Sequence, residues 1–154
     1  MLWRTEDDTA ACARALAALP ALRTAFVALH GDLGAGKTTF ARHLLRALGV
    51  AGRIKSPTYA VVESYPPPAG GLPVWHFDFY RFDDPGEWEA AGLRDLFAAP
   101  GLKLAEWAEK AGAALCAAAD LALYIEAARD DGVRAVRLRA QTPLGRQLLE
   151  ALPA

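Results

Sequence analysis

The chain of 154 residues contains no asparagine and only two cysteines. Without asparagine it cannot carry the N-K-x-D motif that specifies guanine, and this excludes an ordinary GTPase. The two cysteines, Cys12 and Cys116, lie in separate alanine-rich stretches and form no C-x-x-C pair. This arrangement favours reduced, packed thiols in a cytoplasmic protein and argues against a disulfide framework or a zinc site.

The chain also lacks a long apolar run and a block of basic residues. No charge-free apolar stretch approaches the roughly 20 residues of a transmembrane helix. Glu6, Asp7 and Asp8 interrupt the N-terminus where a secretory signal would need an apolar core. The 17 basic and 18 acidic residues nearly balance, without an interleaved stripe of arginine and aromatic residues. We therefore expect no membrane partner and no general binding of DNA, and any contact with nucleic acid should be local or indirect.

A glycine-rich segment, GDLGAGKTT from Gly31 to Thr39, follows a short apolar run and precedes a helix-like stretch over residues 40–48. Its glycines let successive backbone N–H groups converge on phosphate oxygens at a helix N-terminus. Lys37 would then reach the β- and γ-phosphates, and Thr38 would supply a hydroxyl to Mg²⁺. We therefore predict a phosphate-binding loop for a nucleotide and Mg²⁺; the alternative is a glycine turn that only caps a helix.

The predicted contacts with the nucleotide come from this loop and from one arginine far along the chain. They are Asp32, Leu33, Gly34, Ala35, Gly36, Lys37, Thr38, Thr39 and Arg129. Arg129 opens the turn after an apolar strand predicted over residues 121–127, which we expect to run parallel to the strand before the loop. Its end would then share the ligand edge of the sheet, so Arg129 is a hypothesis for the base or ribose end of the nucleotide.

A phosphate loop also needs a carboxylate at the end of a neighbouring strand to hold Mg²⁺, directly or through water. Glu106 follows the apolar run LKLA and qualifies, with a helix-capping acid as the alternative. Asp78 lies between Phe77 and Phe79, where an acid costs free energy unless it is hydrogen-bonded or functional. An ion pair with Arg81 is the alternative for Asp78. Both carboxylates stay open as candidates at this point.

The remaining pattern alternates short apolar strands with helical stretches. Strands are expected at 1–4, 25–29, 59–62, 74–79, 102–105, 121–127 and 133–138, and helices at 5–19, 40–48, 83–95, 107–116 and 143–152. The alternation over 74–79 would place His76 and Asp78 side by side on one face, with aromatic residues on the other. We predict one P-loop NTPase-like domain over residues 1–154, a three-layer α/β fold with a mixed, mainly parallel central sheet.

Four motifs together resemble one family, in order and in approximate spacing. They are GDLGAGKTTF, SPTY from Ser56, HFDFYRF from His76 and EWAE from Glu106. This combination resembles the TsaE (YjeE) family, the bacterial ATPases required for the threonylcarbamoyladenosine modification of tRNA. The resemblance implies a protein that hydrolyses ATP with Mg²⁺ in association with the TsaB and TsaD proteins, and that reaches tRNA indirectly, through that complex.

The same resemblance implies roles for individual residues. Lys37 and Thr38 would bind phosphate and Mg²⁺, and Glu106 would be the second Mg²⁺ ligand. Thr58 and Asp78 would complete the catalytic site. Two other functions stay open: a small-molecule kinase, for which we find no arginine-rich lid segment, and a nucleotide-dependent binding module in which hydrolysis is only a reset.

Overall fold

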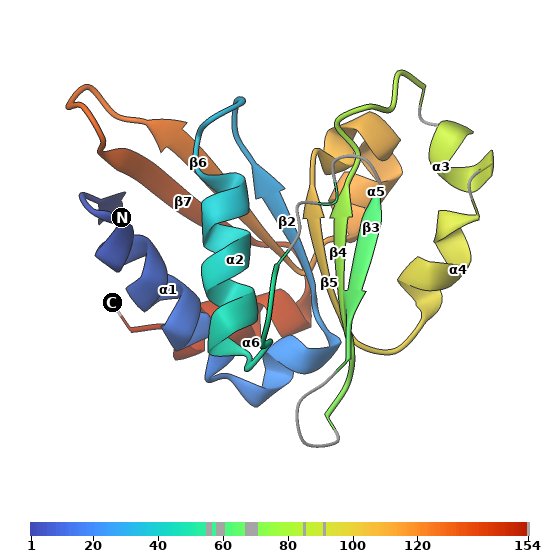
Figure 1. Ribbon diagram of the computed structural model, residues 1–154, viewed down its shortest axis with the longest axis horizontal. Coiled ribbons are helices and arrows are strands. Elements are labelled where there is room, and N and C mark those ends of the chain that lie inside the picture. The colour runs from blue at the N-terminus through green and yellow to red at the C-terminus, as the bar shows by residue number, and fades with distance from the viewer. Residues whose placement is uncertain (55–56, 58–60, 67–70, 85, 91, 154) are drawn as a thin grey trace.

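The computed structural model describes residues 1–54, 57, 61–66, 71–84, 86–90 and 92–153. Its centre is one seven-stranded sheet with the strand order β1-β7-β6-β2-β5-β4-β3 (Figure 1). The strands are β1 (Leu2–Trp3), β2 (Phe26–His30), β3 (Val62–Tyr65), β4 (Val74–Asp78), β5 (Leu102–Glu106), β6 (Leu121–Ala127) and β7 (Arg134–Ala140). The predicted site residue Thr58 and the first residue of its SPTY motif, Ser56, lie outside the described residues.

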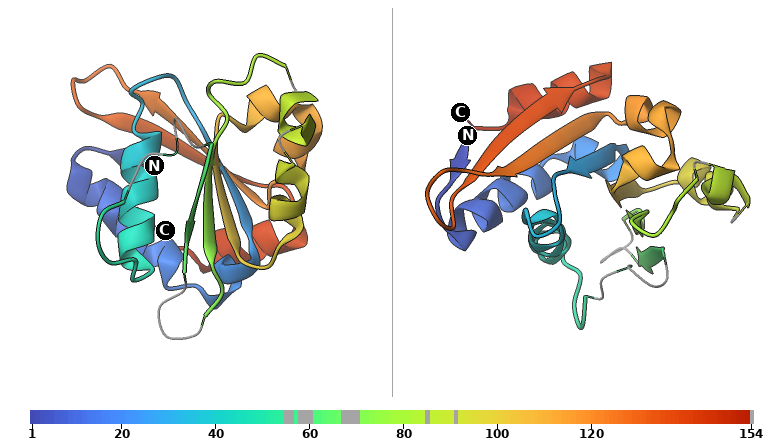
Figure 2. Two further views of the ribbon diagram at one scale, coloured as in Figure 1. Left: turned by 45° about the vertical axis from the view of Figure 1, so that its right-hand side comes forward. Right: turned by 90° about the horizontal axis from the view of Figure 1, so that it is seen from above.

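Helices cover both faces of this sheet, which confirms the predicted three-layer α/β fold. The helical elements are α1 (Glu6–Ala17), η1 (Pro20–Thr24), α2 (Lys37–Ala47), α3 (Gly86–Ala90), α4 (Leu93–Ala98), η3 (Ala108–Ala111), α5 (Ala113–Ala118) and α6 (Pro143–Ala151). Helices α1 and α2 lie on one face and α5 lies on the other (Figure 2). In the described residues, no helix is long and apolar enough to cross a membrane.

The sheet is mixed, and its parallel strands are the four in the middle. Strand β2 pairs in parallel with both β5 and β6, and β4 pairs in parallel with β5. The outer pairs β1–β7, β6–β7 and β3–β4 are antiparallel. The carboxyl ends of β2, β4, β5 and β6 therefore meet at one edge, where α/β proteins bind their ligands.

Alternate residues of the central strands pack into two apolar clusters, one on each face. On β2, Val27 and Leu29 belong to the cluster that includes α1 and α2, whereas Ala28 belongs to the cluster that includes α4 and α5. On β4, Phe77 packs into the second cluster, which leaves His76 on the side of α2, as the alternation predicts. The first cluster also takes in apolar residues of α6.

Two helices predicted as continuous are each divided at a glycine. The stretch 83–95 forms α3 and α4, separated by Gly92 with a φ of 72°. The stretch 107–116 forms η3 and α5, separated by Gly112 with a φ of 117°. A residue with positive φ cannot continue a right-handed helix, and glycine adopts this conformation at little cost. Helix α2 differs in its start, since it begins at Lys37, within the loop motif, and not at Phe40.

Candidate nucleotide-binding site

The glycine-rich loop joins the end of β2 to the start of α2. Gly34 and Gly36 have φ angles of 77° and 113°, in the left-handed region that favours glycine. Gly31 is needed for a different reason, because a Cβ atom there would lie 2.3 Å from the carbonyl oxygen of Ile125 on β6. Gly36 is the N-cap of α2, so the loop presents backbone N–H groups at the N-terminus of an 11-residue helix. This is the arrangement that binds phosphate groups.

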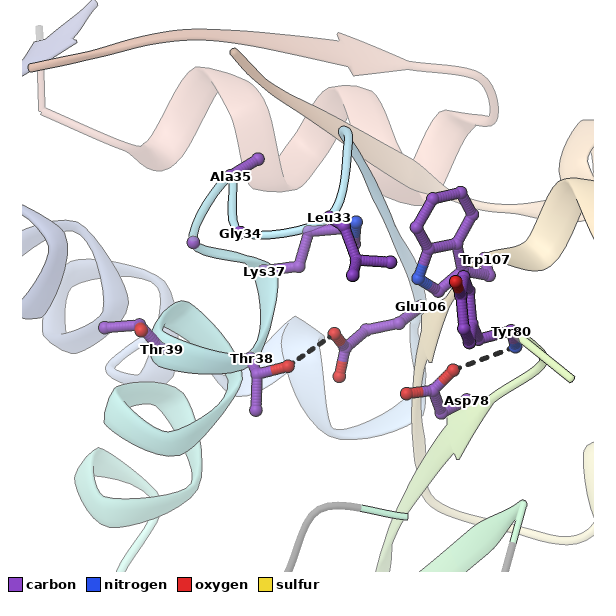
Figure 3. A pocket seen from close by; sticks show the side chains of 11 residues that line it. Leu33, Gly34, Ala35, Lys37, Thr38, Thr39, Asp78, Tyr80, Glu106 and Trp107 are labelled. Carbon is purple, nitrogen blue, oxygen red and sulfur yellow. Dashed lines mark hydrogen bonds between the residues drawn. The ribbon is translucent and has the colours of Figure 1, made fainter. Parts of the chain in front are cut away.

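A pocket with a volume of about 300 Å³ opens between this loop and the carboxyl ends of β4 and β5 (Figure 3). The residues that line it come from segments up to 74 positions apart in the chain, the distance from Leu33 to Trp107. The lining residues are Leu33, Gly34, Ala35, Gly36, Lys37, Thr38, Thr39, Asp78, Tyr80, Glu106 and Trp107. The structure therefore brings both candidate carboxylates to the predicted phosphate loop.

Glu106 connects the first turn of α2 to strand β4. The Thr38 hydroxyl donates a hydrogen bond of 2.8 Å to Oε1 of Glu106, and the two side chains point toward each other in Figure 3. The other oxygen, Oε2, lies 2.7 Å from Nε2 of His76. A hydroxyl and a carboxylate side by side are the hard oxygen ligands that Mg²⁺ prefers, and Mg²⁺ needs few of them because it keeps several waters. The pair Thr38 and Glu106 thus fits a Mg²⁺ ion that also contacts bound phosphates.

Lys37 is the first residue of α2, and its ammonium lies over the pocket. Nζ donates hydrogen bonds to the carbonyl oxygens of Gly31 and Asp32, the latter at 3.1 Å, and lies 4.0 Å from the ring centroid of Trp107. Burial lowers the pKa of Lys37, and nearby carboxylates, first among them Glu106, oppose this shift. No carboxylate of the described residues forms an ion pair with Nζ, so its charge is available to a phosphate.

Asp78 lies opposite Glu106, since the two are partners in the β4–β5 register. Asp78 is 7% exposed, and its Oδ1 accepts a hydrogen bond of 2.9 Å from the backbone N–H of Tyr80. Burial raises the pKa of Asp78, and the negative charge of Glu106 raises it further. A carboxyl group whose pKa is raised inside a pocket is a candidate for proton transfer or for orienting water.

Two predicted residues of the described chain, Asp32 and Arg129, are not among those that line this pocket. Asp32 contributes its carbonyl to Lys37 and lines a neighbouring hollow that also includes residues 125–127. Arg129 is exposed in the turn after β6 and is not among the residues that line the main pocket. Strand β6 does run parallel to β2, as the hypothesis for Arg129 requires. Thr58 lies outside the described residues.

Four residues of this region were not among the predicted site residues. Trp107 directly follows Glu106, while His76 and Tyr80 alternate with Asp78. Each of the three could have been predicted from its position next to a predicted carboxylate. Arg134 on β7 had none: its Nε donates a hydrogen bond of 2.8 Å to the carbonyl of Ala35, 99 positions away in the chain. This bond holds the tip of the phosphate loop to the antiparallel side of the sheet.

Comparison with known proteins gives the family of the chain. The family model described as "Threonylcarbamoyl adenosine biosynthesis protein TsaE" matches residues 3–136. The chain is 44% identical over 125 residues to the tRNA threonylcarbamoyladenosine biosynthesis protein TsaE of Haemophilus influenzae, covering 81% of this chain and 76% of that protein. It is 41% identical over 108 residues to the protein of the same name from Bacillus subtilis, covering 69% of this chain and 65% of that protein.

A solved structure agrees with these matches. The crystal structure of Bacillus subtilis YdiB superposes with a TM-score of 0.72 and 31% sequence identity, over 97% of this chain and 91% of that one. The family match spans the phosphate loop as well as the strand ends that carry Asp78 and Glu106. The chain therefore belongs to the TsaE family, whose role is in the biosynthesis of tRNA threonylcarbamoyladenosine.

Proposed function

We propose that this protein is a Mg²⁺-dependent ATPase in the biosynthesis of tRNA threonylcarbamoyladenosine. The observation that carries the proposal is the 2.8 Å hydrogen bond between Thr38, at the start of α2, and Glu106, at the end of β5. It joins a hydroxyl from the phosphate loop to a strand-end carboxylate, the two protein ligands that a P-loop hydrolase uses to hold Mg²⁺. Membership of the TsaE family supports the assignment to the tRNA pathway.

Each part of the pocket then has a task. The N–H groups of the loop and the ammonium of Lys37 bind the phosphates, while Thr38 and Glu106 hold Mg²⁺. When bound, that ion neutralises charge on the transferred phosphoryl group. Asp78, whose pKa is raised by burial, orients the attacking water through a hydrogen bond and accepts its proton. Thr58 is proposed as a further catalytic residue through the resemblance to the family.

Other parts of the proposal concern the nucleotide and the partners. The absence of asparagine favours ATP over GTP, and Arg129 stays a hypothesis for the base or ribose end. We propose TsaB and TsaD as the partners, with tRNA reached through their complex, and the cytoplasm as the location. The near-balance of charge supports an indirect contact with tRNA, because direct binding relies on basic surface.

Two alternatives make different predictions about turnover. A small-molecule kinase would transfer the phosphoryl group to a second substrate and leave water as a poor acceptor. A nucleotide-dependent binding module would change its affinity for a partner on binding ATP and hydrolyse it only incidentally. Phosphate release from ATP, measured for the chain alone and with TsaB and TsaD, separates both alternatives from the ATPase.

The direct test removes one phosphate contact and one metal ligand in turn. Lys37→Ala and Thr38→Ala should each abolish Mg²⁺-dependent release of phosphate from ATP, because one loses a phosphate cation and the other a ligand to Mg²⁺. Both side chains face the pocket, so the unfolding temperature should stay close to that of the wild type. Near-normal turnover by either variant would refute the site.

A further inference from the structure

His76 is a buried polar residue to which the proposed reaction gives no task. It lies in the middle of β4, paired with Glu63 of β3 on one side and with Leu104 of β5 on the other. The residue is 1% exposed, so its imidazole cannot turn toward solvent. Its Nε2 lies 2.7 Å from Oε2 of Glu106, and its Nδ1 is buried without a hydrogen-bond partner in the described part of the chain.

The chemistry of this contact defines the donor. An ionised carboxylate only accepts hydrogen bonds, so the proton between the two side chains belongs to Nε2 of His76. The imidazole therefore points the N–H of Nε2 at Glu106.

The bond from His76 constrains the side chain of Glu106 next to the proposed Mg²⁺ site. Glu106 is 2% exposed, and its carboxylate must present Oε1 to Thr38 and to the metal. Without a donor, Oε2 would be a buried oxygen with no partner, and the carboxylate would rotate to find one. Lys37 lines the same pocket, and a carboxylate that turned toward its ammonium would move Oε1 away from Thr38.

We infer that His76 is the positioning residue that orients Glu106 for Mg²⁺. Its hydrogen bond to Oε2 of Glu106 keeps Oε1 directed at Thr38 and at the ion. Hydrogen-bond donors behind a metal-binding carboxylate orient it in this way in other proteins. The inference rests on the proposed function, because it assumes that Glu106 is a metal ligand.

The test compares side chains that differ in reach. His76→Gln has an amide nitrogen the same number of bonds from Cβ as Nε2, so it can still donate to Glu106. His76→Asn is one bond too short, and His76→Leu has no donor. The control is His43→Leu, the same change at another histidine. His43 lies on the helix α2, its Nε2 is 2.8 Å from Oε1 of Glu6, and it does not line the pocket.

Each variant is titrated with Mg²⁺ while the binding of a fluorescent, non-hydrolysable ATP analogue is followed, with ATP turnover and thermal unfolding measured in parallel. The Mg²⁺ concentration for half-maximal binding should rise about 10- to 100-fold in His76→Asn and His76→Leu, the usual effect of losing an outer-shell partner. His76→Gln and His43→Leu should keep the wild-type requirement. Binding of the analogue without Mg²⁺ should be the same in all folded variants.

Two results would overturn the inference and leave the ATPase in place. One is a wild-type Mg²⁺ requirement in a folded His76→Leu or His76→Asn variant. The other, which decides the matter if His76→Leu does not fold, is an equal requirement in the Gln and Asn variants, whether normal or raised. If the wild-type protein itself binds the analogue with no dependence on Mg²⁺, the proposed function fails and the inference fails with it.

Discussion

At the scale of single residues, the two carboxylate oxygens of Glu106 have different partners. Oε1 accepts from the hydroxyl of Thr38 and Oε2 faces His76, so a single side chain joins the first turn of α2 to β4 and β5. Asp78 stands beside it in the sheet register and has a raised pKa through burial. This geometry favours Glu106 as the proposed Mg²⁺ ligand. Asp78 is then the residue proposed to orient the attacking water.

Glu106→Ala should lower turnover far more than nucleotide binding, because the metal must be held most firmly when charge develops in the transition state. We expect a loss of about 10²- to 10³-fold in the rate constant for hydrolysis, as when one preorganised contact to the transition state is removed. Steady-state phosphate release over a Mg²⁺ titration measures it. Glu89→Ala, at an exposed acid paired with Arg94, is the control. An unchanged rate and metal requirement would make Glu106 a capping acid and give its role to Asp78.

At the scale of elements, a glycine in helix α6 allows the helix to pack closely against the backbone just before β6. A Cβ atom at Gly145 would lie 1.7 Å from the carbonyl oxygen of Asp120, just before β6. The side chain of Asp120 adds two bonds, since it accepts from the Thr142 hydroxyl at 2.6 Å and from the backbone N–H of Phe26 at 2.7 Å. Thr142 is also the N-cap of α6, and its side-chain oxygen accepts a hydrogen bond of 3.0 Å from the N–H of Gly145. These contacts join the last helix to the start of β2.

Gly145→Ala should therefore destabilise the fold by about 1–3 kcal/mol, the usual cost of overpacking, because backbone and not a flexible side chain occupies the space. Urea unfolding followed by circular dichroism gives the free energy of unfolding. Gly86→Ala is the matched control, since a Cβ atom there meets only the Asp84 side chain at ordinary contact distance. A Gly145→Ala protein as stable as the control would mean that α6 can move away from β6 without cost.

At the scale of the whole molecule, Arg81 and the acidic helix α3 follow the pocket residue Tyr80 in the chain. Tyr80, which lines the pocket, is 40% exposed, and Leu33 at the tip of the phosphate loop is 67% exposed. An enzyme with one lysine and one Mg²⁺ leaves part of the transition-state charge uncompensated. Related hydrolases gain about 10³ to 10⁵ in rate from an added arginine. A partner docked beside the nucleotide can complete such a site.

We therefore expect weak turnover by the chain alone and clear stimulation by TsaB and TsaD together. Arg81→Ala should lower the stimulated rate while basal turnover and the unfolding temperature change little, because Arg81 lies just beyond the pocket lining and next to the proposed docking side. Phosphate release with and without the two partners measures both rates. If the basal and stimulated rates fall by the same factor, Arg81 acts within the resting site and the docking proposal is wrong.

Across these scales, the sequence by itself determined what depends on neighbours in the chain. The phosphate loop needs only glycines, a lysine and a hydroxyl in a fixed order, so Gly31 to Thr39 could be predicted from local spacing. The same holds for the alternation of β4 and for the α/β class. Each of these features follows from backbone geometry over a few residues.

Only the tertiary structure decided which distant residues meet. Thr38 and Glu106 are 68 positions apart, and Arg134 and Ala35 are 99 positions apart. These pairs depend on the order of strands in the sheet, and that order is set by how whole faces are buried, which no local pattern records. The breaks at Gly92 and Gly112 are of the same kind, because glycine adopts both positive and negative φ, so its presence in the sequence does not decide whether a helix ends there.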